Sequence, residues 1–431
     1  MSNTTAISKK DAFIANFMKR PKADLSSNHQ SIREEALQAL TILDLPTSRD
    51  EYWKYTRLTS ITKQEYHHIE VKLDALQDEW KVEGLEANLM VFANGYYQPH
   101  LSNIIDQNVS ILTLDQARIE AYDVVDKHFD QYVNAQNEIF TALNTAFNHT
   151  GVFVHVSKNE VVEHPIHIID VVQGESALVV PRNLFVVDQS AKAQIIHSIV
   201  SNGGEKAFVN GVSEIVVGEN ASVEYQMIQT IGDTNQQIQT TQVTQANNSK
   251  FTTGAFTFNG QLVRNNLNIL VEGTGCETHL NGVYLLDGKM HVDNHSVVDH
   301  LMPHCESNEN YKGVITDKAT GVFNGKVFVR PDAQKINAFQ SNQNILLSDD
   351  ATINSKPELE IYADDVKCSH GSTTGQLNQE GLFYLESRGV KPQEARKLMI
   401  NAFADEALSE VGVDTLKEKL EVMIADRCQQ F

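Results

Sequence analysis

A thiol and an imidazole lie two residues apart in the segment Cys368-Ser-His370-Gly371. On a strand such residues point to the same side, about 6.5 Å apart, so they could hold neighbouring atoms of one small metal cluster. Iron–sulfur centres need about four Cys or His donors, and no second cysteine is close in sequence. We therefore expect another part of the fold, or a second protein, to complete any metal site here. The structural alternative is that Cys368 fills the protein interior and His370 caps a turn.

A second concentration of metal-ligand residue types lies between His291 and Cys305. His291, Asp293 and His295 would share one face of a strand. Imidazole with carboxylate suits zinc or iron, but the spacing matches no established metal signature, so we favour histidines that bond to neighbouring turns. The tract also contains Asp299, His300 and His304. The alternative is that these residues form a metal site and that the protein is a stand-alone metalloenzyme.

The cysteines are widely spaced and never form a CxxC pair; they are Cys276, Cys305, Cys368 and Cys428. This pattern argues against a secreted disulfide scaffold and suits a reducing cytosol. We interpret each of them mainly as a small buried apolar residue. The sequence contains no phosphate-loop motif, no convincing dinucleotide-binding motif and no nucleophile elbow, so these common chemistries are not supported.

The charge balance limits the partners that the protein could bind. Its 431 residues include 35 Lys plus Arg against 56 Asp plus Glu, a formal net charge of −21. Nucleic acids and anionic membrane surfaces attract clustered basic residues, so neither is expected as a partner. No apolar run approaches the ~18 residues that would span a bilayer. The first residues are typical of a helix with polar flanks rather than of a signal peptide, so we expect a cytoplasmic protein, although an organellar transit peptide is left open.

Residues 151–375 are expected to form a β domain. Short runs of alternating apolar and polar residues indicate strands. Pairs such as Asn281-Gly282 and Asn324-Gly325 are interpreted as turns between them. Strand openings at Ala191, Ala221 and Ser249 recur about every 30 residues. This recurrence modestly favours a β-solenoid over a sandwich or a barrel.

The segments on either side of the β domain carry helical patterns. In residues 1–150, which mix helix and strand signals, a capping-box pattern at Ser31–Glu34 predicts a helix start. Apolar residues within 139–147 predict a helix with one buried face. Residues 376–431 indicate a C-terminal helical domain, whose apolar stripes we expect to pack against the rest of the chain, with docking onto another protein as the alternative.

The alternation of apolar residues changes phase shortly before the Cys368 pair. Leu359, Ile361 and Ala363 would lie on one face of a strand, whereas Val366 and Cys368 would lie on the other. Such a slip predicts a bulge or a corner, which often re-aims side chains at a functional place.

Several segments together resemble the SufB/SufD family of iron–sulfur cluster assembly scaffolds. They are YKGV (311–314), VFNGKV (322–327), AQKINA (333–338), SKPELEIYADDVKCSHG (355–371), LFYLESRG (382–389), FTALNTAF (140–147) and, more weakly, WKYT (53–56). The resemblance spans most of the chain, and its C-terminal blocks are long and specific. It implies a mainly β fold, a right-handed parallel β-helix between an N-terminal helical region and a C-terminal helical domain.

Within this family the chain resembles the SufD branch. SufB carries a cysteine in the strand that corresponds here to 339–344, where Asn342 is the nearest match, and the segment DVKCSHG has the SufD form. The resemblance implies that the chain pairs with a SufB-like subunit and binds a SufC-like ATPase through its C-terminal helices. It also implies that His370 acts in cluster assembly at the SufB interface, with Cys368 beside it.

We therefore predict a non-enzymatic scaffold subunit that supports iron–sulfur cluster assembly and iron acquisition at a SufB–SufD junction. His370 and Cys368 would bind iron or the nascent cluster there, while ATP hydrolysis belongs to the SufC-like partner. The rival hypotheses are a stand-alone metalloenzyme that uses the His291–Cys305 tract and a structural partner whose Cys/His pair is inert. The cluster type, flavin binding by the complex and a homodimer without SufB are left open.

Overall fold

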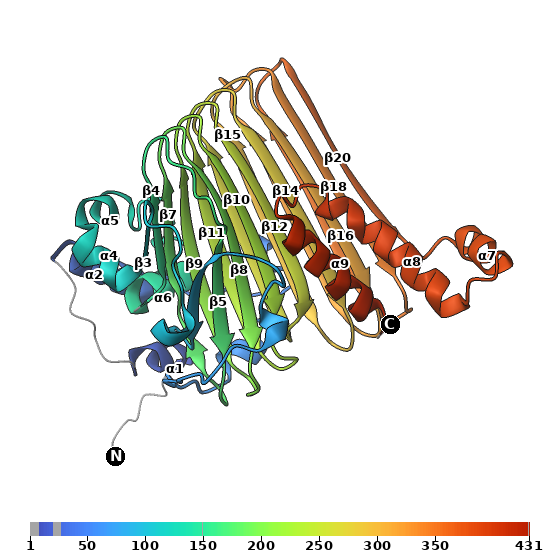
Figure 1. The fold of residues 1–431 in the computed structure, drawn as a ribbon, viewed down its shortest axis with the longest axis horizontal. Helices are drawn as coiled ribbons and strands as arrows, with labels where there is room; N and C mark the ends of the chain where they lie inside the picture. Colours follow the sequence, from blue (N-terminus) through green and yellow to red (C-terminus); the bar gives the residue numbers. More distant parts are fainter. Residues whose placement is uncertain (1–7, 20–26, 149, 430) are drawn as a thin grey trace.

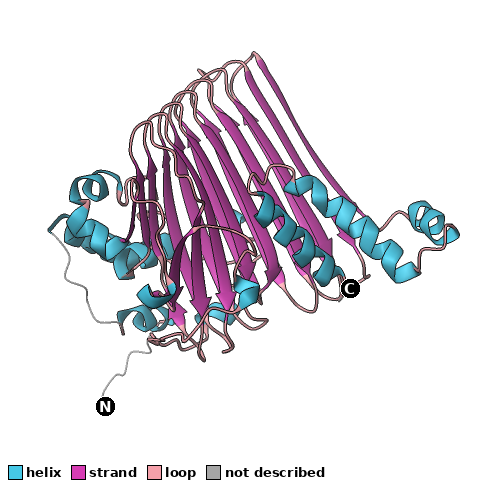
Figure 2. Cartoon of the chain, viewed as in Figure 1, coloured by secondary structure: helices cyan, strands magenta, loops and turns pink. Residues whose placement is uncertain are grey.

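The fold is a parallel β-solenoid with helices at both chain ends, seen in a computed structural model (Figures 1 and 2). The structure describes residues 8–19, 27–148, 150–429 and 431. Successive strands alternate between two sheets, so that each coil adds one strand to each sheet and pairs in parallel with the coil before it. The predicted solenoid is thereby confirmed over the sandwich and barrel alternatives.

Both sheets contain strands from the N-terminal region as well as from the solenoid coils. The first sheet, in spatial order, is β2 (Tyr96–Tyr97), β1 (Asn88–Ala93), β5 (Ile166–Val172), β8 (Lys192–Ser201), β10 (Ser222–Thr230), β12 (Lys250–Asn259), β14 (Glu277–Leu286), β16 (Glu306–Ile315), β18 (Ile336–Leu346) and β20 (Val366–Gly375). The second is β19 (Thr352–Ile361), β17 (Thr320–Val329), β15 (His291–His300), β13 (Leu262–Val271), β11 (Gln236–Gln245), β9 (Phe208–Val217), β7 (Arg182–Val187), β4 (Val152–Val156) and β3 (Ser110–Thr113), with β6 (Leu178–Val179) beside β9. The short strands β2 and β3 pair antiparallel, so the regular parallel ladder begins after them.

Small residues stack at one corner of the solenoid and explain the recurrence in the sequence. Ala191, Ala221 and Ser249 each precede a strand of the first sheet, and all three are buried. Cys276 and Cys305 occupy the same corner in the next two coils. The period of about 30 residues is therefore the length of one coil, and each coil needs a compact residue where the chain turns inward.

Two of the Asn-Gly pairs do not form turns, contrary to the prediction. Asn281-Gly282 lies inside β14, and Asn324-Gly325 lies inside β17. A Cβ atom on Gly282 would lie 2.3 Å from Cε1 of Tyr311, so the missing side chain makes room for a neighbouring ring. Glycine within a strand here marks the close approach of a large interior side chain rather than a reversal of the chain.

The α-helices of the N-terminal region cover the outer face of the second sheet, whereas Trp80 and Leu101 of two 3-10 turns pack against the first sheet. The helical elements of this region are α1 (Lys9–Met18), α2 (Ser27–Ile42), α3 (Thr59–Thr62), α4 (Leu114–Glu120), α5 (Tyr122–His128), α6 (Ile139–Phe147) and the short 3-10 turns Glu51–Trp53, Asp78–Trp80 and Pro99–Leu101. The predicted helix over 139–147 is confirmed, and Phe140 packs with Phe13 of α1 and Phe208 of β9. Ser31 lies one turn inside α2 rather than at its start, because the helix already begins at Ser27.

The C-terminal helices lie across the outer face of the first sheet, except for the outermost one (Figure 1). They are α7 (Gln379–Ser387), α8 (Pro392–Asp405), the 3-10 turn Glu406–Leu408 and α9 (Asp414–Cys428). Leu416, Leu420 and Ile424 of α9 are buried against the sheet, which confirms that this stripe packs on the chain itself. Within the described residues, no helix has the length and apolar character that a membrane crossing requires.

Candidate functional site

The last coil of the solenoid, β19 with β20, differs from all the others in its exposure. β20 pairs with β18 on one side only, and β19 pairs only with β17, so both strands end their sheets. Every residue of β20 is exposed or half-buried, whereas the strands of the middle coils are largely buried. Unpaired strand edges are templates for pairing with another chain. We call this end of the molecule, formed by β19 and β20, the open end.

Cys368 and His370 both lie on β20, at the open end. β20 follows a corner after β19, which confirms the turn predicted from the change of phase. Cys368 pairs in register with Ala338 and His370 with Gln340, and both partners are buried in the solenoid interior. Because in-register partners of a parallel ladder face the same way, Cys368 and His370 point toward the interior but are left uncovered. Burial raises the pKa of the Cys368 thiol, so a metal would have to displace its proton.

Polar side chains fill the interior just behind the open end. Asn342, the nearest match to the position at which SufB carries a cysteine, is fully buried on β18. Its Nδ2 donates to Oη of Tyr284 at 3.0 Å, and its Oδ1 accepts from Oγ of Ser355 at 2.8 Å. Oγ of Ser372, on β20, donates to Oγ of Ser355 at 2.8 Å. A continuous set of hydrogen bonds therefore links the buried core to the last strand.

The first three candidate residues of the tract, His291, Asp293 and His295, form a network that binds the N-terminal segment to the second sheet. Thr56 donates from Oγ1 to Asp293, and its Oγ1 lies 2.8 Å from Nε2 of His291. Asp293 also accepts from Arg264 at 2.5 Å and lies 2.9 Å from Nε2 of His295. Although burial disfavours a charged carboxylate, Arg264 and His295 hold the pKa of Asp293 below its usual range. The carboxylate of Asp293 therefore bonds to side chains of the protein itself, and these contacts form a structural network.

The remaining residues of the tract point in other directions. His300 faces the interior, where its Nε2 lies 3.0 Å from Oγ of Ser307, and His304 sits in an exposed corner with φ of +63°. Cys305 is buried at the corner of the solenoid. The tract is therefore divided among the outer face, the interior and a corner, and it does not form one site.

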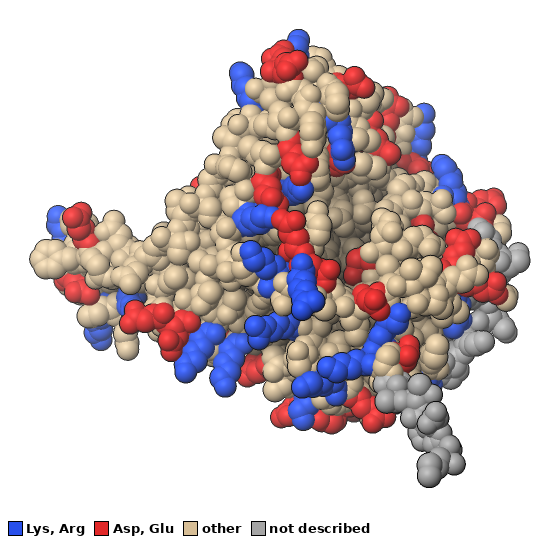
Figure 3. Space-filling view, turned by 180° about the vertical axis from the view of Figure 1, so that it is seen from behind, with Lys and Arg blue, Asp and Glu red and all other residues tan. Residues whose placement is uncertain are grey.

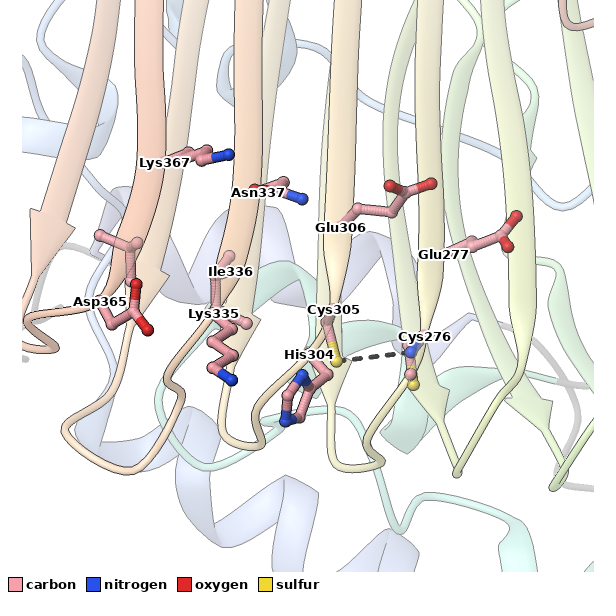
Figure 4. A pocket seen from close by; sticks show the side chains of 12 residues that line it. Cys276, Glu277, His304, Cys305, Glu306, Lys335, Ile336, Asn337, Asp365 and Lys367 are labelled. Carbon is pink, nitrogen blue, oxygen red and sulfur yellow. Dashed lines mark hydrogen bonds between the residues drawn. The ribbon is translucent and has the colours of Figure 1, made fainter.

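Cys276 and Cys305 line a hollow of about 560 Å³ at the corner of the first sheet (Figure 4). The thiol of Cys276 donates to the carbonyl oxygen of Ala246 at 3.1 Å, and that of Cys305 to the carbonyl oxygen of Gly273 at 3.2 Å. These hydrogen bonds satisfy both thiols within the corner, as in buried structural cysteines. Of the four cysteines, only Cys368 is not buried.

Folding also brings together donor groups that the sequence analysis missed. They are Asp106 with Glu163 and His164, and Glu277 with His279 and Glu306, each set with ligand atoms within 4.8 Å of one another. The carboxyl groups of Glu277 and Glu306 point the same way because β14 and β16 pair these residues in register (Figure 4). Only the strand register places them together, and no short spacing in the sequence indicates it.

On the rear face of the molecule, basic and acidic side chains lie around a hollow (Figure 3). Arg330 and Asp299 lie 2.6 Å apart on the outer face of the second sheet. Lys356 of β19 lies 2.6 Å from Glu51 of the N-terminal segment. In both pairs the basic side chain therefore stands next to a carboxylate.

The buried histidine of the tract predicts a loss of stability in mild acid. Burial lowers the pKa of His300 to about 4, so the native state keeps it neutral while the unfolded chain is protonated below its usual value of 6.5. The unfolded state then binds more protons between these values, so the free energy of unfolding falls as the pH drops from 6.5 to 4. His300→Gln should reduce that fall by up to about 3 kcal/mol in urea titrations at several pH values. His304→Asn, in the exposed corner, is the control; an equal effect of both variants would contradict the assignment.

Comparisons with known families were made over the whole chain. Residues 170–403 match a family model described as the SUF system FeS cluster assembly, SufBD core domain. Residues 13–168 match a model described as the SufBD protein N-terminal region. Together the two models include the open end, the solenoid and most of the helices.

Curated relatives match over nearly the full length. An iron–sulfur cluster assembly SufBD family protein of Synechocystis is 33% identical over 426 residues, which cover 95% of this chain and 94% of the relative. The iron–sulfur cluster assembly protein SufD of Escherichia coli is 26% identical over 398 residues, with 91% and 92% covered. SufD of Bacillus subtilis is 27% identical over 414 residues, with 92% and 94% covered.

Proposed function

Because the chain belongs to the SufBD family of iron–sulfur cluster assembly proteins, we propose that it is a non-catalytic scaffold subunit that binds a nascent cluster at its open end. The observation that carries this proposal is the position of His370 and Cys368 on the one strand of the first sheet that lacks a following coil. A thiol and an imidazole supply fewer donors than a cluster requires. The partner that completes the site must therefore approach through this end.

A SufB-like subunit of the same fold is the proposed partner at the open end. A second solenoid could pair its own last strands with the free edges of β19 and β20 and so continue both sheets. Ile361 and Tyr362, at the corner between these strands, are 39% and 58% exposed and would be covered by such contact. Without that partner, a second copy of this chain could occupy the same edge as a homodimer.

The C-terminal helices, residues 376–431, are the proposed binding site for a SufC-like ATPase, while residues 151–375 carry the cluster site and residues 1–150 complete the scaffold. α8 and α9 are anchored on the sheet, where the buried Lys312 bonds to Glu406 at 2.5 Å. α7 projects away from the body (Figure 1) and exposes Phe383 and Tyr384 at 73% and 58%. Exposed aromatic side chains beside a polar surface are typical anchors of protein interfaces. The four free cysteines suit a reducing cytosol as the place of assembly.

Co-expression and affinity purification test this function directly. The tagged chain should purify with a SufB-like and a SufC-like subunit and should hold little iron alone. Phe383→Ser should remove the ATPase subunit and leave the SufB-like subunit bound, because it changes only the projecting helix. Val422→Ser, on the exposed side of α9 at 59%, is the matched control and should keep both partners. A chain that purifies alone with stoichiometric metal would contradict the scaffold function.

A further inference from the structure

Three side chains form a single column directly behind the open end. Glu309 of β16 pairs in register with Gln340 of β18, and Gln340 pairs with His370 of β20. Neighbouring strands lie about 4.8 Å apart, so each of these residues is the immediate neighbour of the next. Glu309 and Gln340 are 5% and 3% exposed, and the alternation places all three on the interior face.

The buried carboxyl group of Glu309 fixes the orientation of the Gln340 amide. Oε1 of Glu309 accepts from Oγ of Ser296 at 2.5 Å, and its Oε2 accepts from Nε2 of Gln340 at 2.6 Å. Burial raises the pKa of Glu309 to about 7, and within the described part of the chain no Lys, Arg or His forms an ion pair with it. Because Nε2 of Gln340 is held by the carboxyl group, its Oε1 must point elsewhere.

The other end of the Gln340 amide has no partner inside the coil. Among the described residues, Oε1 of Gln340 is buried and forms no hydrogen bond. A buried carbonyl oxygen without a donor costs about 1–3 kcal/mol, so such a group in a native protein needs an explanation. The next side chain in the column is the imidazole of His370, whose ring N–H is a donor.

We propose that Gln340 is a positioning residue for His370: its Oε1 accepts a hydrogen bond from one ring N–H and leaves the other ring nitrogen bare to bind iron. Imidazoles that bind metals almost always donate their second N–H to an acceptor, which fixes the tautomer and the ring orientation and makes the ligand more basic. Ser296 and Glu309 would hold this acceptor in place. The inference rests on the proposed function, since it names what prepares His370 for its role.

Replacement of Gln340 by leucine tests the inference in two ways. The leucine keeps the volume of the side chain but removes the acceptor, so cluster formation by the purified complex should fall roughly 10- to 100-fold. Nitrogen NMR of the histidine-labelled full chain, with His370 assigned by its absence in His370→Asn, should show a change in the tautomer ratio of His370. A merely structural role of Gln340 would leave that ratio unchanged.

A double variant provides the rescue. Glu309→Gln with Gln340→Glu reverses the amide–carboxyl pair and again presents an acceptor to His370, so it should recover most of the cluster formation. Gln239→Leu is the matched control, because Gln239 is also buried and donates to Ser213 at 3.3 Å, and its Oε1 forms no hydrogen bond to any described residue, but it lies in the middle of the solenoid. Gln239→Leu should change neither cluster formation nor the tautomer ratio of His370.

Different results would contradict the positioning role of Gln340 and the proposed cluster site at His370. If His370→Ala stops cluster formation while Gln340→Leu changes neither the rate nor the tautomer, the positioning role is wrong and the scaffold function stands. If His370→Ala itself has no effect on an intact complex, the proposed cluster site is wrong.

Discussion

Replacing His370 with alanine is expected to lower iron–sulfur cluster formation by the complex at least about tenfold, while the complex itself stays assembled. His370 is exposed on the last strand, so its removal should cost the fold little. The loss should instead come from the missing iron donor at the open end. Absorbance of the reconstituted cluster, together with size-exclusion chromatography of the complex, measures both quantities.

Two further variants separate the roles of the pair. Cys368→Ser should have the smaller effect, because the raised pKa of this thiol makes it the weaker donor until a metal displaces its proton. His304→Asn changes a histidine in an exposed corner two coils before β20 and should leave cluster formation unchanged. Unaltered cluster formation in His370→Ala, with the complex intact, would mean that the Cys/His pair is inert and that the chain is a structural partner.

Arg182→Met is expected to lower the free energy of unfolding by about 3–5 kcal/mol. Arg182 and Glu214 are both completely buried, where the guanidinium lies 2.6 Å from Glu214 and 2.8 Å from Asp130. The same guanidinium donates to Thr145 of α6 at 2.9 Å, so it joins the N-terminal helices to the second sheet. Methionine keeps much of the volume but leaves two carboxyl groups without their cation. Urea titration followed by circular dichroism measures the change.

An exposed ion pair offers the matched control. Arg330 lies equally close to Asp299, at 2.6 Å, but its side chain is 42% exposed, so Arg330→Met should cost only about 0–1 kcal/mol. Adding Glu214→Gln to Arg182→Met should restore part of the lost stability, because the buried position then carries no charge. Similar losses for Arg182→Met and Arg330→Met would show that burial of the pair is not what makes it important.

The solenoid could be predicted in part from local patterns and from a recurrence of about 30 residues, which by itself favours this fold only modestly. The helix over 139–147 has apolar residues at helical spacing, and Ala191, Ala221 and Ser249 mark one corner in successive coils. The prediction of turns at Asn281-Gly282 was wrong for a reason that lies outside the local sequence. Gly282 leaves room for the ring of Tyr311 in the next coil, and only the register of β14 and β16 brings these two residues together.

The candidate site could be predicted only in part. Cys368 and His370 stand out because their spacing on one strand is visible in the sequence. The interior residues behind them are not visible in this way, since Glu309, Gln340 and His370 are separated by whole coils and meet only through the pairing of β16, β18 and β20. In the His291–Cys305 tract, closeness along the chain left a metal site open as the alternative, and the strand and its corner divide these residues among different surfaces.

The two ends of the solenoid are unlike, since antiparallel β2 and β3 precede the parallel ladder at one end and β19 and β20 leave it unfinished at the other. A protein with equivalent unpaired sheet edges at both ends would stack head to tail into fibres. The opposite edge is formed by the short strands β2 and β3 rather than by a full parallel coil. If two molecules meet through β19 and β20, as proposed, each uses its full-length sheet edge, and assembly would stop at the pair.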